Sequence, residues 1–234
     1  MTTTAPAPEQ FDRRDLILGL LAFASSATDV IAFVKLQQVF TSAMTGNTAL
    51  LGLAIGQGNL SAAIHSLVAL SGYIAGVALG ASVHTRNGQR DLLFLLCVEA
   101  AFLGVFFVQW RLVGFPPEGA WLYTLIASSA VGMGVQSVAA RKVNLDGIPT
   151  VVFTSTLTSI VMTLMQASMR RGAISIFNAK RQLLAFGIYA CGAVMTALLL
   201  WHDITLAIAS PLLAVMIGLT VQTMHLRKEP PVSE

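Results

Sequence analysis

The sequence predicts an all-α protein, a polytopic membrane helix bundle, and two observations carry this prediction. Hydrophobic residues make up 55% of the 234 positions and charged residues only 11%, with a mean hydropathy of +0.74. Such a composition cannot cover the surface of a soluble domain. The apolar runs are also continuous and about 20 residues long, which is the length of a membrane-spanning helix, whereas a membrane barrel needs shorter segments of alternating polarity.

Six segments are apolar enough to cross a bilayer without interruption. In chain order they are residues 16–34, 60–83, 92–110, 121–140, 183–201 and 204–224. Two further apolar segments, 41–55 and 151–169, begin with Ser, Thr and Gly residues, so each is either a full span or a re-entrant half-helix. We expect one membrane domain over 12–228, between polar tails at 1–11 and 229–234.

The positions of Lys and Arg favour the re-entrant alternative, because short loops rich in these residues stay on the cytoplasmic side. If both ambiguous segments re-enter and both termini are cytoplasmic, the cations left outside are only Lys35 and Arg111. If both segments span, the cations left outside are Lys35, Arg86, Arg90, Arg141 and Lys142. The charge bias therefore favours six full spans plus two re-entrant segments, while both topologies stay open.

A polar motif occurs twice along the chain. The run FTSAMTGN at 40–47, the first hinge, returns in degraded form as FTSTLTSI at 153–160, the second hinge. Three spans plus one re-entrant segment make an odd number of crossings, so the second copy would be inserted upside down. We therefore expect an inverted internal repeat with halves 12–113 and 119–226, a design in which matching polar interruptions line the substrate or ion pathway.

The two hinges supply most of the candidate pathway residues. Half-helices starting near Thr45 and Thr154 would point their free N–H groups and positive dipole ends at the middle of the bilayer. The predicted lining groups are Thr41, Ser42, Thr45, Gly46, Asn47, Thr154, Ser155 and Thr158.

Ionisable residues inside spans are costly, so they should face protein or water and mark function. Asp29 precedes the first hinge and is equally suited to carry a coupling proton, to bind a cation or to clamp the extended backbone by hydrogen bonds. Glu99 is the second such residue. The place comparable to Asp29 in the second half holds Gln136, an uncharged group, which argues against symmetric proton coupling. We assign these three residues orienting or coupling roles in the pathway.

Other classes of function find little support. No two of the 4 His residues have the spacing of a metal site, and no catalytic or phosphate-binding motif occurs, so we expect neither an enzyme nor a cofactor. The cations are spread along the chain and form no nucleic-acid-binding face. Gly72, Gly76 and Gly80 form a small-residue seam that packs against another helix of the chain or a second copy, which leaves a homo-oligomer open.

Asp29, Met44-Thr45-Gly46-Asn47, Gly134-Val135-Gln136 and the Thr-rich second hinge together resemble the YoaK family, a domain of unknown function numbered 1275. The resemblance covers 15–226 and departs from the family pattern at Ser137 and Ser159, where an Asn and a Gly are usual. It implies a bacterial inner-membrane protein that crosses the membrane about six times, but no activity or substrate.

Two hypotheses of function follow from these residues. The leading one is a small-solute channel or secondary transporter embedded in the lipid bilayer, with its pathway between the hinges and an unknown solute. The alternative is a non-transporting membrane scaffold or assembly factor that uses Gly-rich helices to bind other membrane proteins. A membrane-embedded enzyme is a more distant third.

Overall fold

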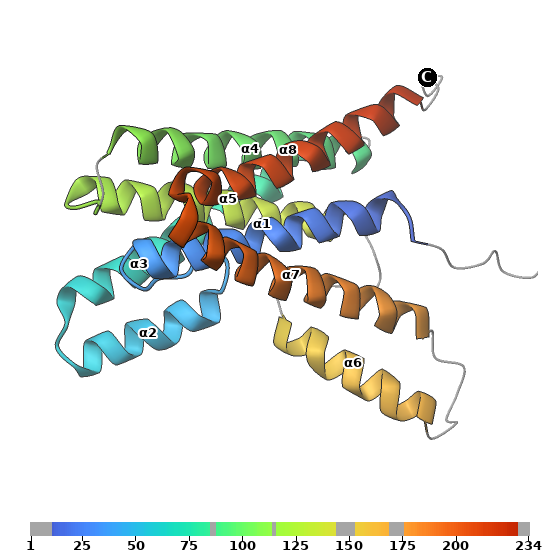
Figure 1. The fold of residues 1–234 in the computed structure, drawn as a ribbon, viewed down its shortest axis with the longest axis horizontal. Helices are drawn as coiled ribbons and strands as arrows, with labels where there is room; N and C mark the ends of the chain where they lie inside the picture. The colour runs from blue at the N-terminus through green and yellow to red at the C-terminus, as the bar shows by residue number, and fades with distance from the viewer. Residues whose placement is uncertain (1–10, 85–87, 114–115, 144–152, 169–175, 229–234) are drawn as a thin grey trace, which may run out of the picture.

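The computed structural model describes residues 11–84, 88–113, 116–143, 153–168 and 176–228, and within these ranges all regular structure is helical (Figure 1). The helices are α1 (Arg13–Lys35), α2 (Met44–Gly56), α3 (Leu60–Ser82), α4 (Gly88–Leu112), α5 (Ala120–Lys142), α6 (Phe153–Ser168), α7 (Ile176–His202) and α8 (Ile204–Lys228). The predicted span 60–83 and the observed α3 nearly coincide, and each of the other five predicted spans lies within one of the observed long helices. The prediction of a polytopic helical membrane protein is confirmed.

Helix length separates the six predicted spans from the two interrupted segments. The long helices α1, α3, α4, α5, α7 and α8 contain stretches that are apolar enough to cross a membrane. By contrast, α2 has 13 residues and α6 has 16. At about 1.5 Å per residue these two helices are about 20 and 24 Å long, less than the hydrocarbon core of about 30 Å.

The two short helices lie along one side of the bundle and begin about midway along its length. Figure 1 shows α1 beginning and α8 ending at the same end of the long axis. After α1 has reached the opposite end, the chain returns toward the middle, where α2 begins and runs outward again. Helix α6 also begins near the middle but runs to the end where α1 begins and α8 ends. Each short helix thus begins about midway along the bundle, and the two point in opposite directions, as a pair of re-entrant half-helices would.

The helices are paired in a pattern that maps the first four helices onto the last four. Helix α1 packs mainly on α7 and α8, α5 packs mainly on α3 and α4, α2 packs on α3, and α6 packs on α7. Helices α1 and α5 lie at the centre of the bundle. In each of them 72% of the most apolar 18-residue stretch is buried, whereas the corresponding share in the other four long helices is 22% to 39%. Each half thus places its first helix among helices of the other half.

The Gly seam of α3 packs against α5 of the same chain. A Cβ atom on Gly72 would lie 3.1 Å from the carbonyl oxygen of Ala127, and one on Gly76 would overlap the carbonyl of Val131. On the other side, a Cβ on Gly134 of α5 would overlap the carbonyl of Tyr73. The backbones approach this closely because no side chain intervenes, so α5 already occupies the seam.

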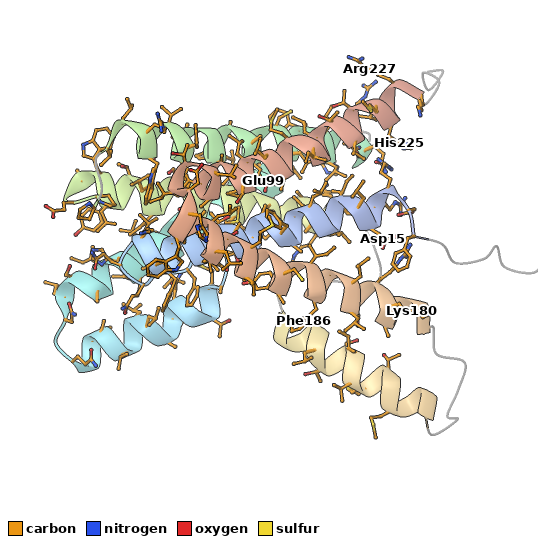
Figure 2. All side chains as sticks on the ribbon, in the orientation of Figure 1. Asp15, Glu99, Lys180, Phe186, His225 and Arg227 are labelled. Atoms are coloured by element: carbon orange, nitrogen blue, oxygen red, sulfur yellow. The ribbon has the colours of Figure 1, made fainter. Side chains whose placement is uncertain are left out.

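Charged side chains gather at the end of the bundle where α1 begins and α8 ends. Figure 2 shows Asp15, Lys180, His225 and Arg227 there. Two ion pairs join helices in this region: Asp15 with Arg181 between α1 and α7, and Asp91 with Lys142 between α4 and α5, each at 2.8 Å. In both pairs the acid is buried, so these contacts fix the helix ends with little competition from water.

Candidate functional site

A strained reversal of the chain after α1 leads into the first hinge. Gln37 and Gln38 both have left-handed backbone angles, with φ of 62° and 61°, which cost energy in residues other than Gly. The rings of Phe33 and Phe40 stack with their centroids 5.0 Å apart and hold the returning chain against α1. The reversal places Thr41 beside α1, about two turns before its end.

The carboxylate of Asp29 binds this returning chain. Its Oδ1 atom accepts the backbone N–H groups of Thr41 and Ser42, at 2.7 and 2.8 Å, and the Thr41 hydroxyl at 3.2 Å. Its Oδ2 atom accepts the hydroxyls of Ser42 at 2.6 Å and of Tyr189 at 3.3 Å. Five donors thus converge on one acid that is 3% exposed. This is the geometry of the hydrogen-bond clamp, one of the three roles that the sequence left open.

Asn47 ties the start of α2 to the same loop. Its side-chain oxygen accepts the N–H of Phe40 at 2.9 Å, and its amide nitrogen donates to the carbonyl oxygen of Phe40 at 2.6 Å. A Cβ on Gly46 would lie 2.9 Å from the Phe40 ring, so only Gly fits under it. The polar groups of Thr41, Ser42 and Asn47 therefore bond to the protein itself.

Thr45 is different, because it faces outward. Its side chain is exposed, and neither its backbone N–H nor its hydroxyl has a partner among the described residues. The residue before α2, Ala43, provides no side-chain cap. The first turn of α2 thus presents an unsatisfied donor and the positive end of the helix dipole about midway along the length of the bundle.

The second hinge is only partly described. Helix α6 begins at Phe153, one residue before the predicted start. The side chains of Thr154 and Ser155 lie outside the described part of the structure, whereas Thr158 is exposed on α6. The structure therefore supports the position of this half-helix and leaves the roles of its first hydroxyls as predictions.

Gln136 and Glu99 lie together, and no described hydrogen bond joins either of them to the first hinge. Gln136 occupies the same register in α5 as Asp29 in α1, and its Nε2 atom donates to the carbonyl oxygen of Leu21 at 2.9 Å. Glu99 of α4 lies beside Gln136 and is fully buried. Neither carboxylate oxygen of Glu99 has a hydrogen-bond partner of ordinary geometry among the described residues.

Sequence reasoning missed two residues that form hydrogen bonds with Asp29 or Ser42. Ser25 donates its hydroxyl to the hydroxyl of Ser42 at 2.7 Å. It lies one helical turn before Asp29 on the same face of α1, a spacing that would have linked the two residues. Tyr189 comes from α7, far away in the sequence, and its only signal is a phenol within an otherwise small and apolar span.

The fold and these hinges define a multi-pass α-helical membrane protein with two internal half-helices. The sequence model of the family described as "Protein of unknown function (DUF1275)" matches residues 17–221, and the chain belongs to this family. The chain is also similar to the UPF0700 transmembrane protein YoaK of Bacillus subtilis (strain 168), with 33% identity over 192 residues, 79% of this chain and 83% of that protein. The resemblance to the YoaK family is thereby confirmed. No solved structure matches the chain.

Proposed function

We propose that the protein is a small-solute channel or secondary transporter of the bacterial inner membrane, with both termini in the cytoplasm. The first hinge carries this proposal: a helix start near mid-bundle is held by Asp29 and Asn47, while Thr45 next to it stays exposed and unpartnered among the described residues. Unwound backbone at membrane depth is tolerated where protein buries it or where it lines a cavity. Half-helix ends placed this way serve solute and ion binding in transporters.

In this proposal the residues of the first hinge and its neighbour Asp29 have two different roles. Asp29, Ser42 and Asn47 position the loop, and Thr45, with the groups of the second hinge, lines the path. The pairing pattern of the helices supports an inverted repeat, in which the two half-helices approach the pathway from opposite faces. The rival scaffold role would use small-residue seams to bind partners, and α5 of the same chain fills the seam of α3.

Solute flux into proteoliposomes tests the proposal. Swelling would be followed by light scattering with urea, glycerol, alanine, acetate and phosphate as probes. Thr45→Ala should slow the permeant probe about tenfold, the effect of losing one hydrogen bond of about 1.4 kcal/mol in the path. Thr48→Ala is the matched control, because the exposed Thr48 lies on the same helix and its hydroxyl already bonds to Met44 at 2.9 Å.

Two results would count against transport. One is wild-type protein, correctly oriented, that passes none of the probes. The other is an equal effect of both Thr substitutions.

The orientation of the protein in the membrane is measured in a separate experiment. It uses the single substitution Gln57→Cys, in the exposed turn after α2, after Cys97 and Cys191 have been replaced by Ala. The proposed topology predicts that the introduced thiol reacts with an impermeant maleimide from outside intact cells, and labelling only after lysis contradicts that topology.

A further inference from the structure

Glu99 differs from every other buried acid in the described residues. The buried carboxylates are Asp15, Asp29, Asp91 and Glu99. Asp15 and Asp91 each form an ion pair, with Arg181 and Lys142, at 2.8 Å. Asp29 accepts five hydrogen bonds. Neither carboxylate oxygen of Glu99 has an ion-pair partner or a hydrogen bond of ordinary geometry among the described residues, although the side chain is 0% exposed. One buried acid is thus left without an ion pair or an ordinary hydrogen bond to stabilise a negative charge.

No described charged group approaches Glu99 from the helices packed around it. Helix α4 packs on α5 and α8. The described cations of these two helices all lie in their last turns and are Arg141, Lys142, His225, Arg227 and Lys228. On α4 itself the nearest charged neighbour along the chain, Asp91, lies about 12 Å away along the helix axis at about 1.5 Å per residue. Figure 2 shows Glu99 about midway along the bundle, far from the charged end.

We propose that Glu99 is a proton-binding site that holds a neutral carboxylic acid in this structure. An isolated carboxylate away from water is far less stable than the protonated acid, because burial removes hydration and no described cation replaces it. A second step rests on the proposed transport function: the proton that Glu99 binds is the coupling ion. The carboxylate takes a proton from water on one side of the membrane and returns it to water on the other.

Gln136 is able to form a hydrogen bond with either form of Glu99, the carboxylate or the carboxylic acid. One amide hydrogen of Gln136 is donated to Leu21. The second hydrogen and the carbonyl oxygen remain, so Gln136 is able to donate to a carboxylate or to accept from a carboxylic acid. Because Leu21 belongs to α1, which also carries Asp29, loading and unloading of Glu99 would act directly on the helix that holds the first hinge. Gln136 is a positioning residue in this scheme.

Infrared spectroscopy of the full-length protein in lipid vesicles tests the proton site without any solute. Wild-type protein at neutral pH should show the carbonyl stretching band of a buried, protonated carboxylic acid, shifted in D₂O. The band should disappear in Glu99→Gln, shift in frequency in Gln136→Leu and persist in Asp29→Asn. Absence of the band from folded wild-type protein, or its persistence in E99Q, overturns the proposal. If E99Q fails to fold, Gln136→Leu decides, because an unshifted band then contradicts the assignment.

Proton movement tests the coupling step. Vesicles loaded with the pH dye pyranine would receive a gradient of whichever probe wild-type protein transports. Wild-type protein should acidify or alkalinise the lumen together with solute flux, and E99Q should fall to the level of protein-free vesicles. Solute flux by wild-type protein with no change in dye signal overturns the coupling step. If no probe crosses, the proposed function fails, while the infrared result still decides the proton site.

Discussion

Removing the Asp29 carboxylate should loosen the first hinge in graded steps. Asp29→Ala leaves the buried N–H groups of Thr41 and Ser42 without an acceptor, and each unsatisfied group costs about 1–3 kcal/mol, hence about 2–6 kcal/mol together. Asp29→Asn keeps one acceptor oxygen but loses the charge. A bond to a charged group is worth about 1 kcal/mol more than a neutral one, so the two backbone bonds weaken by about 2 kcal/mol.

Amide hydrogen exchange of the peptide covering 40–47, measured by mass spectrometry in nanodiscs, reports this loosening. Since about 1.4 kcal/mol changes an equilibrium tenfold, Asp29→Asn should speed exchange about 30-fold and Asp29→Ala still more. Asp15→Asn is the control, because Asp15 is also buried in α1 but pairs with Arg181 at the charged end. Exchange that stays at the wild-type rate in both Asp29 variants, or rises equally in Asp15→Asn, would refute the clamp.

Two further predictions concern stability. Gly76→Ala should destabilise the bundle by at least about 1–3 kcal/mol, because its Cβ would overlap the carbonyl of Val131. Gly187→Ala, with open space at its Cβ, should be neutral or stabilising. Thermal unfolding in detergent distinguishes the two, and similar midpoints would contradict the packing argument. Asn47→Ala should cost about 1–3 kcal/mol by releasing both backbone groups of Phe40; unchanged amide exchange at Phe40 would show that the bonds contribute nothing.

The first hinge illustrates how far residue type alone carries a prediction. Thr41, Ser42, Thr45 and Asn47 are all small polar residues in one interruption, so the sequence assigned them all to the pathway. In the structure three of them bond to the protein, and only Thr45 is exposed without a described partner. Side-chain chemistry indicates that such groups must be satisfied, but it does not say by what, because the partner depends on how the chain folds back.

The sequence by itself determined the class of protein, the six spans and the positions of the two interrupted segments, and it left open whether these two segments cross the membrane or re-enter. These features depend on the lengths of apolar runs, the places where Ser, Thr and Gly interrupt them and the distribution of cations, all of which are local along the chain. The tertiary structure decided that Asp29 clamps the loop together with Tyr189 of α7, and that Glu99 is buried without a partner of ordinary geometry among the described residues. It also decided that the Gly seam of α3 belongs to α5. These outcomes depend on which distant helices become neighbours, and burial removes the water that would otherwise satisfy each polar group.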